Sequence, residues 1–165
     1  MAEQKEIRCY EYVNRPYDRI AQVLRNDAVG LFHRATTAAG ARAENVAAKL
    51  KINVAGFEIG KDVKVELVSL DDTVHAPGEH VGPATALGLR WVAASAAAFF
   101  PSMRAELHIY PLSADETQLD LVGSYTPPGG LLGSAADAIA GRRIAEASVH
   151  RFLEEIAARL SADLA

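Results

Sequence analysis

The stretch Gln-Leu-Asp-Leu-Val-Gly-Ser-Tyr-Thr-Pro-Pro-Gly-Gly, residues 118–130, decides the fold because two kinds of periodicity meet at it. Apolar and polar side chains alternate up to Tyr125, which is typical of a strand with one buried face. Pro127-Pro128 ends that strand, and helical spacing follows. A long helix is predicted from about residue 134 to residue 162, with an apolar stripe. The stripe consists of Val149, Phe152, Leu153, Ile156 and Leu160.

Alternation of period two also marks most of the chain upstream. It predicts four further strands, in residues 46–54, 63–68, 87–93 and 104–110. Short polar turns separate neighbouring segments, so sequential antiparallel pairing is the simplest topology. The link from Asp71 to Pro83 is longer and holds two prolines and two glycines, which predicts an irregular loop.

The first forty residues predict one strand and two helices. Ile7–Val13 is rich in β-branched and aromatic residues, which favour a strand. Pro16 marks the start of a helix with Ile20 and Val23 on one face, and a second short helix closes at Gly40. The expected class is α+β: a strand, two short helices, an antiparallel run of five strands, and a long helix. Only the last helix is expected to be long enough to cover the apolar face of the sheet.

Composition excludes several classes of protein. The chain has 165 residues, one expected domain over residues 1–165, and a net charge of −4, which disfavours nucleic-acid binding. A single cysteine, Cys9, excludes an internal disulfide and a multi-thiolate zinc site. The start has no apolar segment typical of a signal peptide, so a cytoplasmic location is expected. The longest apolar stretch, residues 91–101, is too short for an integral membrane segment.

Residues suited to catalysis or metal binding are few. His75, Glu79 and His80 form a possible ligand trio in the predicted long loop, but their spacing matches no zinc motif. A solvated loop over a pocket mouth is the preferred interpretation, and no metal or cofactor is expected. His108 is predicted on the polar face of its strand, and no nucleophile elbow is present.

The pattern resembles the helix-grip fold of the START-like (SRPBCC) superfamily, and within it a bacterial branch that shares a strand–Pro-Pro-Gly–helix signature. The matching segments are Leu89–Trp91, Phe100–Leu107, Ile109–Leu112, Gly123–Gly129, Asp137, Arg143, Ala145–Ala147 and Phe152-Leu153. This resemblance implies a curved antiparallel sheet wrapped around the long C-terminal helix, with a largely apolar cavity between them. The superfamily includes lipid carriers, hormone receptors and polyketide cyclase/dehydrase-type enzymes, so the fold alone selects no function.

Eight residues are candidates for contact with a ligand in such a cavity: Leu89, Trp91, Leu107, Tyr125, Arg142, Glu146, Val149 and Phe152. Core packing is the alternative for the apolar residues and the two inward aromatic residues. On a helical wheel Arg142 lies near the centre of the apolar stripe, with small Ala145 beside it. Arg142 either forms a local ion pair with Glu146 at the cavity edge or offers its guanidinium group to an acidic head group.

Binding of a hydrophobic or amphipathic small molecule, lipid-like or polyketide-like, is therefore the expected function. The alternative is a polyketide cyclase/dehydrase-type enzyme in which Tyr125 and Arg142 polarise a carbonyl of an aromatic or poly-keto substrate. A protein-interaction module with a vestigial cavity is a third hypothesis, disfavoured by the polar outer faces of the strands. The oligomeric state is left open, a homodimer included.

Overall fold

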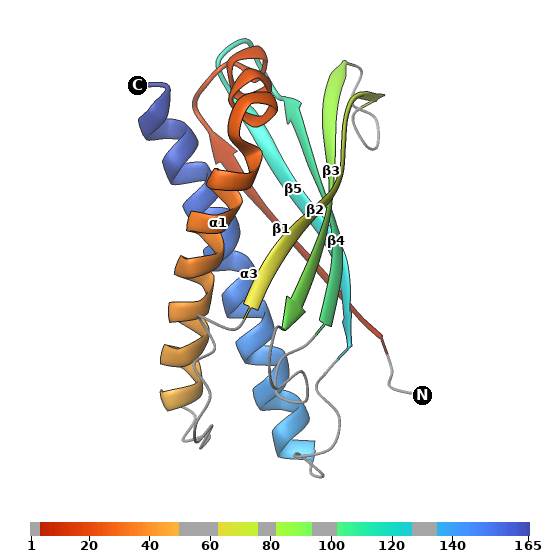
Figure 1. Ribbon diagram of the computed structural model, residues 1–165, viewed down its shortest axis with the longest axis vertical. Coiled ribbons are helices and arrows are strands. Elements are labelled where there is room, and N and C mark those ends of the chain that lie inside the picture. The colour runs from red at the N-terminus through yellow and green to blue at the C-terminus, as the bar shows by residue number, and fades with distance from the viewer. Residues whose placement is uncertain (1–3, 50–62, 76–81, 94–101, 127–134) are drawn as a thin grey trace.

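One antiparallel sheet and two long helices make up the part of the chain that the computed structural model describes, which is residues 4–49, 63–75, 82–93, 102–126 and 135–165. The sheet order is β1-β5-β4-β3-β2, and the helices cover one of its faces (Figure 1). The elements are β1 (Lys5–Val13), α1 (Tyr17–Lys49), β2 (Val63–His75), β3 (Pro83–Ala93), β4 (Ser102–Pro111), β5 (Thr117–Thr126) and α3 (Ala135–Asp163).

The predicted phase of the strands is confirmed. Leu87, Leu107 and Leu121 lie opposite one another on β3, β4 and β5, and all three are fully buried. Their neighbours along the strands, such as Glu106 and Val122, are exposed. The face that carries Leu107 is called the inner face below, and the opposite one the outer face.

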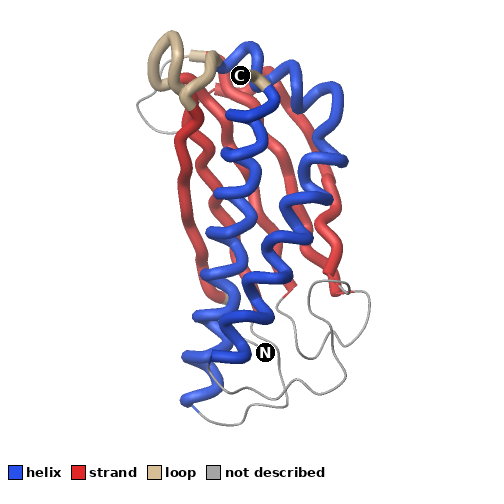
Figure 2. The backbone as a smooth tube through the Cα atoms, turned by 90° about the vertical axis from the view of Figure 1, so that its left-hand side faces the viewer, coloured by secondary structure: helices blue, strands red, loops and turns tan. Residues whose placement is uncertain are grey.

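Both helices, not the C-terminal helix alone, cover the inner face. α1 and α3 lie side by side over the sheet (Figure 2). Aromatic contacts join the layers: the Phe32 ring of α1 lies 5.9 Å from the Phe152 ring of α3, which lies 5.1 Å from the Trp91 ring of β3. The long helix predicted over residues 134–162 is confirmed, and its stripe from Val149 to Leu160 is buried. In the described part of the chain, neither helix is long and apolar enough to cross a membrane.

The two helices predicted after the first strand meet at Asp27 within α1. Asp27 has non-helical backbone angles (φ −150°, ψ 47°), and its carboxylate accepts a hydrogen bond from the Gly30 N–H at 3.0 Å. A carboxylate that accepts from the third residue of a helix is an N-cap, so Asp27 breaks the first helix and starts the second. The predicted boundary between two helices is therefore confirmed.

The second of these helices is longer than predicted, and the strand predicted over residues 46–54 is wrong. α1 continues past Gly40 to Lys49, so residues 46–49 are helical. Residues 50–54 lie outside the described ranges. Alternation is a weak signal over residues 46–49 because two of these four residues, Ala47 and Ala48, are alanines, and alanine has the highest helix propensity and is depleted in strands.

The loop predicted from Asp71 to Pro83 is shorter than expected, since β2 extends to His75 and β3 begins at Pro83. Two register shifts, between Leu67 and Ser69 and between Asp71 and Val74, interrupt the pairing of β2 with β3. Such bulges bend a strand and increase its twist. They explain why simple alternation ended too early in the sequence.

Arg15 fixes the far end of α3. Its Nε donates to the Leu164 carbonyl at 3.1 Å, and its Nη2 donates to the Ser161 carbonyl at 2.8 Å. The last carbonyls of a helix lack partners within the helix, and a cation is favourable there. α3 has no basic residue in its own last turn, so the turn after β1 supplies one. This contact joins the end of α3 to the turn after β1.

Candidate ligand-binding site

The candidate site is built on a row of four inner-face residues that lie opposite one another across the sheet. Val65 of β2 is opposite Trp91 of β3, Trp91 is opposite Met103 of β4, and Met103 is opposite Tyr125 of β5. We call these residues the inner row. Trp91, Met103 and Tyr125 are buried, and Val65 is half-buried against the core. The row lies at the end of the sheet from which α3 starts (Figure 1).

Trp91 connects the inner row to α3. Its ring meets the Phe152 ring edge to face, with an interplanar angle of 89°. The residue is only 7% exposed, and its indole Nε1 is shielded from solvent. Within the described part of the chain this nitrogen has no hydrogen-bond partner.

Tyr125 connects the inner row to the polar start of α3. Burial raises the pKa of its hydroxyl, the negative charge of Glu146 raises that pKa further, and the positive charge of Arg142 opposes the rise. The Tyr125 hydroxyl therefore lies within electrostatic range of both charged residues and stays protonated near neutral pH. It can donate a hydrogen bond to an oxygen atom placed beside it.

Arg142 and Glu146 form an ion pair one helical turn apart. Arg142 Nε donates to Glu146 Oε1 at 2.7 Å, and the two side chains are 62% and 43% exposed. This bond raises the pKa of the Arg142 guanidinium. On the same helix, Ala145, which lies between the two charged residues in the chain, and Val149, which follows them, are buried. Within two turns, α3 thus changes from charged and solvent-exposed residues to apolar and buried ones.

The structure brings together the eight residues proposed from the sequence in two groups. Six of them are buried, on the inner face of the sheet or on the stripe of α3 that faces it: Leu89, Trp91, Leu107, Tyr125, Val149 and Phe152. The other two, Arg142 and Glu146, lie at the exposed rim beside Tyr125. Leu107 lies two rows further along the inner face than Trp91, opposite Leu87 and Leu121, inside the packed core.

Gly123, two residues before Tyr125 on β5, leaves no free space on the inner face. A Cβ at this position would come within 2.7 Å of the Arg104 carbonyl oxygen and 2.8 Å of the Ala105 Cβ. The missing side chain lets β5 approach β4 closely. Gly123 therefore serves strand packing and not cavity volume.

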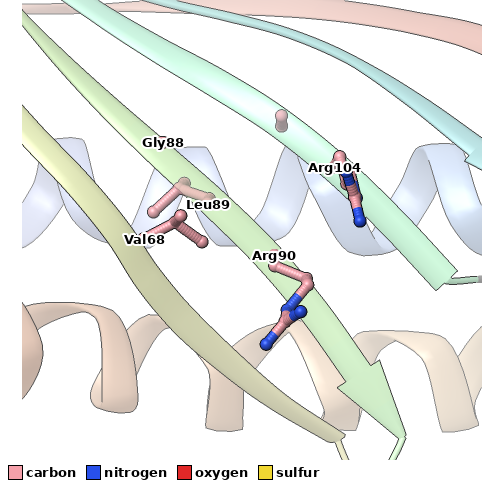
Figure 3. Close-up of a pocket in the computed structure, with 6 residues that line it drawn as sticks. Val68, Gly88, Leu89, Arg90 and Arg104 are labelled. Atoms are coloured by element: carbon pink, nitrogen blue, oxygen red, sulfur yellow. The ribbon is translucent and has the colours of Figure 1, made fainter.

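A hollow that the sequence pattern did not indicate lies on the outer face. It encloses about 260 Å³ over β2, β3 and β4, and its lining includes Gly88, Arg90 and Arg104 (Figure 3). Arg90 and Arg104 are directly opposite each other, and Arg90 is paired with Glu66. Like charges opposite each other are unfavourable in a sheet. Spacing alone could not reveal this hollow because a β-bulge at Val68 sets its shape.

A second unpredicted feature of the outer face is a buried carboxylate. Asp120 is paired with Arg8 through two hydrogen bonds, at 3.2 Å from Nε and 2.9 Å from Nη2. The Asp120 side chain is only 3% exposed, whereas that of Arg8 is 68% exposed. A two-bond pair of this kind is specific in geometry and neutralises a carboxylate that would otherwise be costly to bury.

The histidines in the described part of the chain lie away from the inner row. His108 is on the outer face as predicted, and its Nε2 lies 3.2 Å from Glu106 Oε2 on the same strand. His33 and His150 are exposed on helices. His75 is the last residue of β2, and Glu79 and His80 lie outside the described ranges. No group of three metal-binding side chains occurs in residues that the structure describes.

No family model and no curated protein matches the chain. Among solved structures, a protein from Thermus thermophilus is similar with a TM-score of 0.50 and 14% identity, over 98% of this chain and 100% of that one. The Zhui aromatase/cyclase from Streptomyces sp. R1128 gives 0.49 and 18%, over 99% and 97%. Norcoclaurine synthase from Thalictrum flavum gives 0.45 and 11%, over 100% and 99%. The chain therefore shares the fold of the Thermus thermophilus protein, and its antiparallel sheet with a long C-terminal helix is the helix-grip fold.

Proposed function

We propose that this protein binds a hydrophobic or amphipathic small molecule between the inner face of the sheet and α3. The observation that carries the proposal is the change of polarity along the stripe of α3 at the level of Tyr125. Arg142 and Glu146 form an exposed pair, and the buried Val149 and Phe152 follow within a few turns. An amphipathic ligand would match this gradient with a polar head at the rim and an apolar body inside.

The chemistry of the rim suits an acidic or carbonyl head group. A guanidinium presents several N–H donors in a planar fork, and Arg142 uses its Nε toward Glu146. The protonated Tyr125 hydroxyl adds a donor beside it. Small Ala145 lies one residue before Glu146 on the buried side of the helix, where a larger side chain would compete with a ligand for space.

The proposal can be tested by filling the site from α3. Ala145→Leu adds three carbons to a buried position, whereas Ala158→Leu adds the same carbons to an exposed position of the same helix. Binding of 8-anilinonaphthalene-1-sulfonate, an amphipathic anion, is followed by its fluorescence. We expect Ala145→Leu to weaken binding about tenfold or more and Ala158→Leu to leave it unchanged. Equal affinities in the parent and both variants would contradict a site at this place.

A further inference from the structure

The indole N–H of Trp91 is a buried donor that lacks an acceptor in the described residues. Trp91 is the one tryptophan of the chain, more than nine-tenths buried on the inner face. Buried polar groups in folded proteins are nearly always hydrogen-bonded, and each exception requires an explanation. The explanation must account for an N–H shielded from water inside the candidate site.

The residues that surround Trp91 in the sheet cannot supply the missing acceptor. Its neighbours on the two flanking strands are Val65 and Met103, whose side chains carry no oxygen atom. The ring that it touches belongs to Phe152. An aromatic face or a thioether sulfur is a weak acceptor and does not replace a bond to oxygen.

The Tyr125 hydroxyl is a second hydrogen-bond donor in the inner row. Trp91 and Tyr125 lie on β3 and β5 at the same level, with β4 between them. Because neighbouring strands are about 4.8 Å apart, the two backbones are about 10 Å apart. Met103 separates them, and its flexible side chain can adapt to different shapes. A molecule lying across β4 would reach a donor at each end.

We infer that the ligand carries a hydrogen-bond acceptor oxygen, such as a ketone, ether or phenol oxygen, at the end that lies against Trp91. This inference rests on the proposed function and deepens it, because it names the class of ligand. The site would then select an oxygenated ring compound with polar atoms at both ends over a plain acyl chain. Trp91 would act as a specificity-determining residue, and the rim at Tyr125 and Arg142 would hold the opposite end.

A matched pair of probes tests the inference. 6-Acetyl-2-naphthoic acid carries a carboxylate at one end and a ketone at the other, and 6-isopropyl-2-naphthoic acid replaces the ketone by an apolar group of similar shape. Calorimetric titration into the intact chain should show the ketone binding about tenfold more tightly, the value of one ordinary hydrogen bond. Trp91→Phe, which keeps an aromatic ring without the N–H, should abolish this preference. Tyr125→Phe should weaken both probes and preserve the preference.

A second measurement does not depend on any variant. Because the chain has one tryptophan, its single indole N–H signal in a ¹H–¹⁵N NMR spectrum is assigned without ambiguity. We expect the ketone probe to move the indole proton downfield and to slow its exchange with solvent, and the isopropyl probe to do neither. Equal affinity of the two probes with an unmoved indole proton would overturn the inference alone. Binding of neither probe would overturn the proposed function together with it.

Discussion

Arg142 and Glu146 are joined by a 2.7 Å hydrogen bond across one turn of α3, at the point where the stripe of the helix passes from solvent into the core. The pair therefore has the geometry of a local i,i+4 ion pair, which the sequence offered as one of two interpretations. It also lies beside the Tyr125 hydroxyl, whose pKa both charges influence. Arg142 can pair with Glu146 in the free protein and still contact the head group of a ligand. Removing its charge tests whether it does both.

Arg142→Met should weaken acidic ligands and spare their neutral analogues. The substitution keeps most of the apolar stem and removes the charge and its donors. We expect 2-naphthoic acid to bind about tenfold more weakly, as for the loss of a hydrogen bond between charged groups, and 2-naphthamide to bind nearly as before. Thermal stability should hardly change, since exposed pairs contribute little. Arg151→Met is the matched control, because the exposed Arg151 also pairs with a glutamate one turn away on α3, Glu155. Equal losses for acid and amide would refute the role of Arg142.

Leu107→Ala should destabilise the fold by about 2–5 kcal/mol. Leu107 is fully buried at the centre of the inner face, and its removal leaves a cavity that the surrounding strands cannot close. Val122→Ala on the outer face, where the side chain is 44% exposed, should change stability by less than about 0.5 kcal/mol. Chemical denaturation of both variants gives the comparison. Similar losses for the two would mean that the inner and outer faces are assigned wrongly.

Gly123→Ala and Gly88→Ala should differ although the substitution is the same. The new methyl group at residue 123 would meet backbone and Cβ atoms of β4, which cannot move away, so we expect a loss of about 1–3 kcal/mol. At residue 88 it would meet the Ser69 hydroxyl, an exposed side-chain atom that can rotate. That variant should be neutral or slightly stabilised, because alanine restricts the unfolded chain. Unfolding midpoints decide the matter, and a stable Gly123→Ala protein would contradict the close approach of β5 to β4.

Stability should fall in alkali partly because of Cys9. Burial raises the pKa of its thiol from 9.0 to about 12, so the native state keeps a proton that the unfolded chain releases. Below pH 9 both states are protonated and the thiol has no effect. Between pH 9 and about 12 the unfolded state binds fewer protons, and the free energy of unfolding decreases by up to about 1.4 kcal/mol per pH unit. In Cys9→Ala the free energy of unfolding should decrease less steeply over this pH range. The same pH dependence of the free energy of unfolding in parent and variant would contradict a native thiol that stays protonated.

Most of the fold could be predicted because alternation and helical spacing report burial directly. Most residues of β3, β4 and β5 alternate, and the large apolar side chains predicted to face inward, such as Leu107, are buried. The segment around Ala47 and Ala48 gave a wrong prediction because alanine can be counted as either polar or apolar in an alternating pattern, whereas its own preference is for a helix. The length of β2 was predicted too short for another reason: its two bulges interrupt the alternation of period two.

The candidate site was predictable in composition but not in geometry. Trp91 and Tyr125 could be placed on the inner face from alternation, yet their position on the same level of the sheet depends on register, which spans β4. Whether the Trp91 N–H has a partner depends on which side chains meet it across three elements. The Arg8–Asp120 pair could not be predicted either, because its residues are 112 positions apart in the chain and meet only through the pairing of β1 with β5.

The position of a bound amphipathic probe tests the proposed site most directly, because the sheet offers two distinct faces. Intermolecular NOEs are measured between 6-acetyl-2-naphthoic acid and the methyl groups of the protein. We expect contacts to Met103, which lies on the inner face, and to Val149, which lies on the buried stripe of α3, and none to Val122. Contacts confined to Val68 and its neighbours, at the outer-face hollow, would contradict a ligand site between the sheet and α3.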